Sequence, residues 1–215
     1  MRKTTIILST LILISCVAKN IDTDKINSLD YFEPVAFINL TNNENTTTIN
    51  DSISQLVSHR LDSIINEYSH RFRIRKKLEI RDPSLQKSFE KEVADLIFEK
   101  FINKNPEINI PTPTIDSILQ INNSNFTMLN VVTGFQRTKK NFRNQTLKSL
   151  GIGLLTLGNA IPIYSKNSIT TYTLIFDSNG EKIVFEKKTD LTESKPTKPS
   201  VLRSELIKTF RNYYF

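Results

Sequence analysis

The chain has 215 residues, a formal net charge of +7 and a single cysteine. One cysteine excludes disulfide bonds within the chain, so burial must stabilise the fold, and roughly 180 residues are enough for that. The positive charge alone fits a nucleic acid, an anionic membrane, an acidic polymer or a merely solvated surface.

The N-terminal residues, MRKTTIILSTLILISC, have the layout of an exported precursor. Two basic residues precede an apolar stretch over residues 4–15, which is shorter than the roughly 20 residues that a spanning helix needs. The run Leu13-Ile14-Ser15-Cys16 resembles the lipobox of bacterial lipoproteins, in which the cysteine is acylated and becomes the new N-terminus. We therefore expect residues 1–15 to be a signal peptide and Cys16 to carry lipid. A buried cysteine after an ordinary signal peptide is the alternative.

The residues after the cysteine bear on which membrane holds the chain. Val17 stands where lipoproteins retained at the inner membrane usually have Asp, and the first acidic residues, Asp22 and Asp24, come late for a surface-exported lipoprotein. We expect an outer-membrane location facing the periplasm. Export removes nucleic acid from the candidate partners and leaves the membrane, through the N-terminal lipid, and another envelope protein.

The remaining chain divides into a tether and one domain. Residues 16–33 lack hydrophobic periodicity and are interpreted as a lipidated tether, and residues 34–215 as a single domain without internal repeats. The element order predicts an α/β domain, with α+β as the alternative. It would have a mixed sheet, amphipathic helices on the sheet, and a C-terminal β-hairpin and helix.

Hydrophobic periodicity and capping residues place the individual elements. Asn50 or Asp51 is expected to cap the first helix, Asp82 followed by Pro83 the second, and Thr114 the third. The expected elements are a strand over 35–40, a polar loop over 41–50, a helix over 53–68, a strand over 77–81, a helix from 83 to 101, a short helix over 115–119, a strand over 126–135, a hairpin of strands over 169–177 and 181–188 around Asn179-Gly180, and a helix over 201–213.

The apolar segment 150–163 is rich in glycine, with Gly151, Gly153 and Gly158. It lacks the spacing of a dinucleotide-binding motif, and the glycines favour close packing or a bend. A buried strand and turn is the favoured interpretation. Insertion into a membrane or a partner is the alternative.

The segments TPTIDSILQINNSNFTMLNVVTGFQR, GIGLLTLG and IFDSNGEKIVF carry a family resemblance. Over about residues 110–215 the chain resembles a group of Bacteroidetes-type lipoproteins, which supply no catalytic motif to transfer. The element order is also distantly similar to the N-terminal domain of the periplasmic Tol translocation protein and to the curli-secretion lipoprotein. Those modules bind partners or assemble, so the resemblance implies a non-enzymatic role.

Three kinds of candidate site remain. His59 and Asp62 lie three residues apart on one helix, but no further ligand or nucleophile accompanies them, so a solvated helix face is favoured over catalysis. A basic cluster interleaved with Phe135 and Phe142 consists of Arg137, Lys139, Lys140 and Arg143. It would contact an anionic ligand if it projects from the sheet edge, and a solvated edge is the favoured interpretation. Asp-Ser-apolar sequences resemble the O-glycosylation sequon of the Bacteroidetes at Ser52, Ser63 and Ser117. Ordinary capping and surface roles in the helices are the favoured interpretation of these residues.

These observations predict a membrane-anchored envelope lipoprotein that binds or scaffolds a partner in an outer-membrane assembly, without enzymatic activity, metal or cofactor. Two alternatives stay open. One is an envelope enzyme acting on glycan or lipid, with carboxylates such as Glu67 or Asp116. The other is direct binding of anionic peptidoglycan or lipopolysaccharide through the basic cluster.

Overall fold

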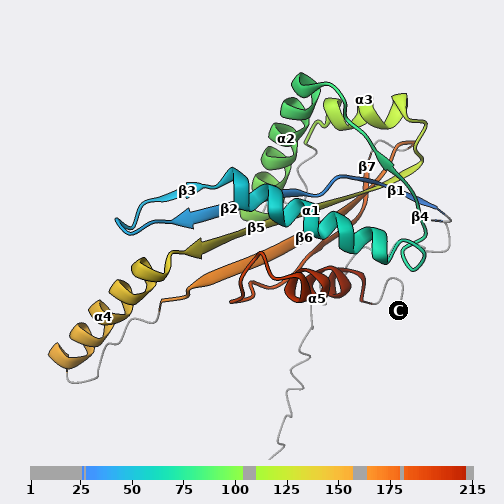
Figure 1. The fold of residues 1–215 in the computed structure, drawn as a ribbon. Helices are drawn as coiled ribbons and strands as arrows, with labels where there is room; N and C mark the ends of the chain where they lie inside the picture. The colour runs from blue at the N-terminus through green and yellow to red at the C-terminus, as the bar shows by residue number, and fades with distance from the viewer. Residues whose placement is uncertain (1–25, 27, 104–109, 157–163, 180–181, 212–215) are drawn as a thin grey trace, which may run out of the picture.

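The computed structural model describes residues 26, 28–103, 110–156, 164–179 and 182–211 (Figure 1). The described strands form one mixed sheet with helices on both faces, which confirms the predicted single α/β domain. The predicted signal peptide, Cys16 and the first part of the predicted tether lie outside the described residues.

The longest strand, β5, is central in the sheet. Strand β6 pairs antiparallel with one edge of β5, and β1 and β2 pair parallel with its other edge. Outside them lie β4, parallel to β1, then β3, antiparallel to β2, and β7, antiparallel to β6. The bounds are β1 Leu29–Phe32, β2 Val35–Thr41, β3 Thr47–Ile49, β4 Ile74–Leu78, β5 Phe126–Arg137, β6 Asn167–Asp177 and β7 Lys182–Lys188.

Strands β1 and β2 follow the same edge of β5 with a bulge between them. Tyr31 pairs with Met128 and Val35 with Val131, so one extra residue is accommodated on the β1–β2 side. Pro34 lies in this interruption, where its missing N–H costs no ladder hydrogen bond. The sheet edge is thereby divided into a part flanked by β4 and a part flanked by β3.

Helices form one layer on each face of the sheet, and α4 projects from its end. Because side chains alternate along β5, Met128 and Val132 pack in the core under α1 and α5, whereas Leu129 and Val131 pack in the core under α2 and α3. The helix bounds are α1 Asp51–Glu67, α2 Pro83–Ile97, the π-helical turn η2 Phe98–Ile102, α3 Pro113–Ile121, α4 Lys139–Leu155 and α5 Pro199–Phe210.

The predicted caps of the first two helices are confirmed. The side chain of Asn50 accepts a hydrogen bond from the backbone N–H of Ile53 at 2.9 Å, and that of Asp82 accepts one from Ser84 at 2.8 Å. The third helix begins earlier than predicted, after Thr112, because a proline also occupies its first turn.

The predicted boundary between tether and domain at residue 34 is wrong. Strand β1 lies inside the predicted tether, and its four residues are all buried. Ile26 is also fully buried in the core under α1 and α5. The short run LDYF has no periodicity that would identify a strand; pairing with β4 and β5, which are distant in sequence, makes it one.

Two further strand predictions need correction. Strand β4 occupies Ile74–Leu78 instead of 77–81, because its basic side chains lie on an exposed sheet edge, where charge does not oppose strand formation. The predicted loop 41–50 contains β3, which folds back on β2 as the second strand of a hairpin.

The predicted buried strand over the first part of segment 150–163 is wrong as well. Residues up to Leu155 continue helix α4, which Figure 1 shows projecting from the end of the sheet. Ile152 is 38% exposed and Leu147 on the same helix is 59% exposed. The remainder, residues 157–163, lies outside the described residues.

Candidate functional site

Figure 1 shows the sheet extending beyond α2 and α3 toward α4, and this part is called the open sheet end. It carries a hollow. It comprises β3 and the adjoining ends of β2, β5 and β6. The hollow has a volume of about 350 Å³ and is lined by Asn39, Thr41, Thr47, Thr133, Gly134, Phe135, Arg137 and Ser168.

Gly134 permits a close approach of two strands beside this hollow. A Cβ atom at residue 134 would lie 2.2 Å from the backbone oxygen of Ser168 on β6, a distance that real side chains do not adopt. The glycine therefore lets β5 and β6 keep full pairing up to the open sheet end.

A second hollow lies between the β2–β3 turn and α4, with a volume of about 460 Å³. Side-chain amides dominate its wall, and each amide offers both hydrogen-bond donors and acceptors. The lining residues are Asn43, Glu44, Asn45, Asn141, Asn144, Gln145, Leu147 and Lys148.

Arg137, at the end of β5, lines the first hollow and bonds to two residues of the second. Its Nε donates to the backbone oxygen of Ser165 at 3.0 Å, and its Nη1 donates to the side-chain oxygens of Asn141 at 3.1 Å and Asn45 at 3.3 Å. The guanidinium also lies 5.5 Å from the centre of the Phe135 ring. Arg137 is thus fixed in place entirely by neutral groups.

Hydrogen bonds from the β2–β3 turn fix the beginning of α4. Thr138 accepts a hydrogen bond from the backbone N–H of Asn141 at 3.2 Å and donates to Asn43 at 2.8 Å. Gln145, one turn further, donates to Asn45 at 3.2 Å. Asn141 is 1% exposed and Gln145 9%, so these amides form a buried polar seam between turn and helix.

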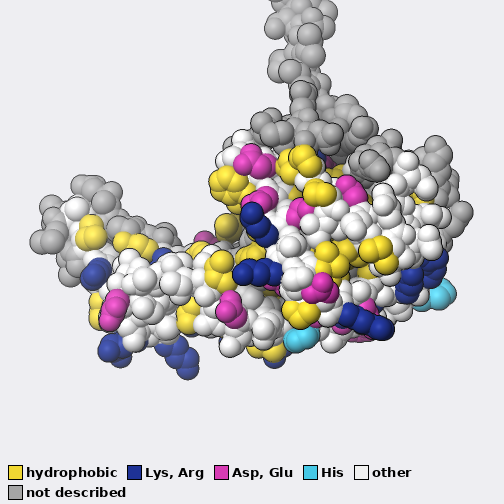
Figure 2. All heavy atoms as spheres, turned by 90° about the horizontal axis from the view of Figure 1, so that it is seen from above, with side chains coloured by type: hydrophobic (Ala, Val, Ile, Leu, Met, Phe, Trp, Pro, Cys, Tyr) yellow, Lys and Arg dark blue, Asp and Glu magenta, His cyan; other side chains and the backbone are white. Residues whose placement is uncertain are grey.

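The predicted basic cluster is divided between two environments. Arg137 belongs to the polar seam, whereas Lys139, Lys140 and Arg143 are exposed on the first two turns of α4. Figure 2 shows the arm formed by α4 standing clear of the body, with basic side chains along it. No acidic residue lies in the first turn of α4.

His59 and Asp62, which lie three residues apart on α1, do not pair with each other. His59 Nδ1 lies 3.4 Å from Glu33. Asp62 instead accepts a hydrogen bond from Tyr31 at 3.1 Å and forms an ion pair with Lys77 at 3.2 Å. Burial, followed by the neighbouring Asp62, raises the pKa of Tyr31 to about 12. The group is a set of mutually paired side chains between α1 and the sheet.

Sequence reasoning missed a buried ionic network around Asp30, which is 1% exposed. Arg75 donates two hydrogen bonds to its carboxylate, at 2.8 and 2.5 Å, and Ser124 donates one at 2.6 Å. Burial opposes ionisation of Asp30, but the hydrogen bonds from Arg75 and Ser124 outweigh it, and its pKa lies below the usual value. No sequence signal identifies this network, because its members come from β1, β4 and the turn before β5.

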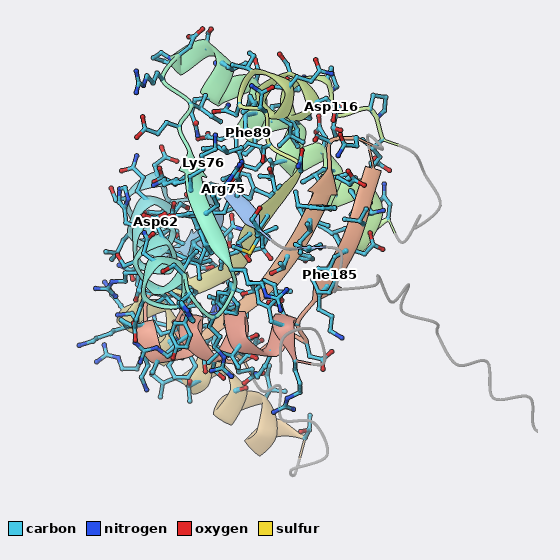
Figure 3. The ribbon with its side chains drawn as sticks, turned by 90° about the vertical axis from the view of Figure 1, so that its right-hand side faces the viewer. Asp62, Arg75, Lys76, Phe89, Asp116 and Phe185 are labelled. Carbon is cyan, nitrogen blue, oxygen red and sulfur yellow. The ribbon has the colours of Figure 1, made fainter. Side chains whose placement is uncertain are left out.

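The carboxylates suggested for an enzymatic alternative are not brought together. Glu67 pairs with Arg203 on the face covered by α1 and α5, whereas Asp116 accepts a hydrogen bond from Thr112 on the face covered by α3. Figure 3 shows Asp116 well apart from Asp62, which shares α1 with Glu67. Two carboxylates on opposite faces of a sheet do not form a catalytic pair.

The three predicted glycosylation sites are exposed. Ser52 and Ser63 lie on α1, where Ser63 donates to the backbone oxygen of His59, and Ser117 lies on α3. Their glycosylation stays a prediction. Within the described part of the chain, no three His, Cys, Asp or Glu side chains are grouped as for a metal ion, and none of its helices has the length and apolarity to cross a membrane.

Comparison with known proteins adds little. No protein-family model matches the chain, and no curated protein matches its sequence. The chain is similar to the C-terminal domain of LpoB from Salmonella enterica, with 6% sequence identity over 78% of this chain and 84% of that chain and a TM-score of 0.32. A similarity this low carries no argument about function.

Proposed function

We propose that this chain is a lipid-anchored, non-enzymatic binding component of an outer-membrane assembly, and that the open sheet end is its binding surface. The observation that carries the proposal is the pair of adjoining hollows around Arg137. Their walls consist mainly of amides, hydroxyls and one guanidinium, which keep a single protonation state near neutral pH. Such groups bind a ligand by hydrogen bonds and are poor proton-transfer catalysts.

The titratable groups elsewhere support binding over catalysis. Asp30 and Asp62 are occupied by Arg75 and Lys77, and these ion pairs lie between elements of the fold. They link β1 to β4 and α1 to β4, as expected of contacts that hold elements together.

The anchor is proposed from the lipobox at Cys16. Cells that express the full chain with metabolically labelled palmitate should yield a labelled protein in the outer-membrane fraction. The Cys16→Ser variant should carry no label and leave the membrane fraction. An unlabelled wild-type chain, or one retained inside the cell, would contradict the anchor and the envelope location together.

The binding surface is tested separately by site-specific photo-crosslinking in intact cells. A photo-reactive residue at the half-exposed Asn144 or at the exposed Thr48 should give covalent adducts, because both flank the open sheet end. The same residue at the exposed positions Glu90 or Gln120, on α2 and α3, serves as the matched control. Adducts of equal yield at all four positions, or none at the first two, would remove the open sheet end from the proposal.

A further inference from the structure

The electrostatic environment of Arg137 indicates the chemical class of the ligand that the open sheet end binds. Elsewhere in the fold, Arg75 and Arg203 each bind a carboxylate, that of Asp30 or of Glu67, through two hydrogen bonds. Arg137 has only neutral acceptors, and its Nη2 makes no hydrogen bond to any residue that the structure describes. Arg137 lines the first hollow, and its Nη2 can still donate hydrogen bonds. The acceptors that match a guanidinium best are a carboxylate and a phosphate.

The surroundings strengthen the preference for an anion. Glu44 is the acidic residue among the side chains that line the two hollows. Basic residues outnumber it on the hollows and the adjoining start of α4, and these are Arg137, Lys139, Lys140, Arg143 and Lys148. An unbalanced positive field of this kind raises the local concentration of anionic ligands.

The remaining polar groups favour a ligand that carries many hydroxyls. Asn39, Asn43 and Asn144 present amides, and Thr47 and Thr133 present hydroxyls, on the walls of the two hollows. Amides and hydroxyls both donate and accept, as sugar hydroxyl groups do. The half-buried Phe135 adds an apolar ring surface against which the C–H face of a sugar ring can pack.

We infer that the open sheet end binds an anionic saccharide. The acidic group of the ligand, a carboxylate or a phosphate, contacts Arg137, and its hydroxyls contact the amides between the β2–β3 turn and α4. The two hollows, of about 350 and 460 Å³, each fall within the size range of small-ligand sites. The inference rests on the proposed binding function and adds the chemical class of the ligand.

Isothermal titration of the full-length acylated chain in neutral detergent tests the inference. The probes are a galacturonic acid oligosaccharide, a phosphorylated oligosaccharide of the same length, the neutral galactose oligosaccharide and polyglutamate. Binding of either acidic sugar at least about tenfold tighter than both the neutral sugar and polyglutamate is expected, and the better probe distinguishes carboxylate from phosphate. Such a tenfold ratio corresponds to about 1.4 kcal/mol. Equal binding of polyglutamate would show unspecific attraction to polyanions and overturn the inference, as would no binding of either acidic sugar.

The variant Asn45→Asp distinguishes an effect on ligand binding from an effect on the stability of the fold. Its carboxylate would take the place of the amide oxygen that accepts from Arg137 Nη1 at 3.3 Å, and aspartate tolerates the left-handed backbone of residue 45, whose φ is 66°. We expect affinity for the acidic sugar to fall about tenfold while the urea midpoint stays equal or rises. Unchanged affinity would overturn the inference.

The exposed wall supplies a second, independent variant with a matched control. Lys148→Glu on α4 should weaken binding of the acidic sugar several-fold, whereas Lys91→Glu, an equal charge change on the exposed face of α2, should leave it unaltered. Equal losses in the two variants would count against a local site. Crosslinks to a protein at Asn144 without sugar binding would uphold the proposed binding surface and overturn the saccharide as its ligand.

Discussion

The two ends of the sheet use polar side chains in opposite ways. At the end covered by helices, Asp30 is buried against Arg75 and Ser124, so opposite charges neutralise each other within the fold. At the open sheet end, Arg137 is held by neutral amides and a backbone oxygen, so its charge is not cancelled. Ion-paired side chains stabilise the fold, whereas a positioned cation without a carboxylate partner can still bind an anionic ligand.

Hydrophobic packing follows the same division. Phe89 is 2% exposed and its ring centre lies 4.8 Å from that of Phe32, so the covered end contributes a continuous core. Ile49, on β3 at the open sheet end, is 57% exposed. Substitutions of apolar residues should therefore lower the free energy of unfolding strongly at the covered end and hardly at all at the open sheet end.

The largest expected difference tests this packing contrast. Phe89→Ala should lower the free energy of unfolding by about 3–5 kcal/mol, because it removes a buried ring and leaves a cavity. Ile49→Ala should change it by at most about 0.5 kcal/mol. Urea unfolding of both variants measures the difference. Similar losses would mean that the open sheet end is as tightly integrated in the core as the covered end.

The second-largest change in stability is expected from the ionic network around Asp30 at the covered end. Asp30→Asn should destabilise the chain by about 2 kcal/mol at neutral pH, since hydrogen bonds to a charged group are lost from a buried site. The pKa of Asp30 is lower in the fold than its usual value of 3.8, so its stabilising contribution is present above that value and is lost as the pH falls through the folded-state pKa.

Unfolding free energies measured from about pH 6 down to about pH 2 check the sign of this linkage. The wild-type chain should lose the contribution of Asp30 in the acidic part of that window, and Asp30→Asn should lack this component. Asp95 is exposed, so Asp95→Asn serves as the control and should show the same acid-dependent loss of stability as the wild type. Parallel pH profiles for the wild type and Asp30→Asn would contradict a structural role of the network.

The seam between the β2–β3 turn and α4 should give a smaller, local effect. Asn45→Ala removes the acceptor for Arg137 and Gln145 and places alanine at a φ of 66°, at a cost of about 1–2 kcal/mol. Hydrogen exchange should accelerate in α4 and stay unchanged in α1. Glycine adopts a positive φ without strain, so the destabilisation of Asn45→Gly should reflect only the lost side-chain hydrogen bonds. Acceleration throughout the domain would show that α4 is not a separate arm.

The sequence predicted the elements whose determinants are local and missed those determined by distant partners. Helices α1 and α2 begin as expected because Asn50 and Asp82 cap the turn beside them. The β6–β7 hairpin was likewise predicted from alternation on either side of a turn. Strand β1 was missed because its identity depends on pairing with β4 and β5.

The candidate site was predicted in part for the same reason. Arg137 was recognised as basic, but its partners Asn45 and Ser165 lie far from it in sequence, so its enclosure by neutral groups had no sequence signal. The exposed charges of α4 needed only composition to be noticed. The sequence thus indicates that a basic surface exists, and the fold determines which cation is fixed and without a counter-charge.

The smallest expected effect on stability concerns the lysines at the start of α4, where stability and ligand affinity should change in opposite directions. Lys139 and Lys140 lie in the first turn of α4, where the positive end of the helix dipole disfavours cations. Replacing either by glutamate should stabilise the chain by about 0.3–1 kcal/mol at low salt. If these lysines serve an anionic ligand, the same changes should weaken sugar binding, so stability and affinity move in opposite directions.

Lys148→Glu is the internal control, because residue 148 lies beyond the first turn of α4 and lines the second hollow. It should weaken binding without the gain in stability, since the dipole effect falls off within one turn. Added salt should reduce both the stabilisation and the affinity differences, because exposed charges are screened. If Lys139→Glu were to raise stability and leave affinity intact, the basic start of α4 would be a solvated surface, and the ligand contact would be confined to Arg137 and the amides around it.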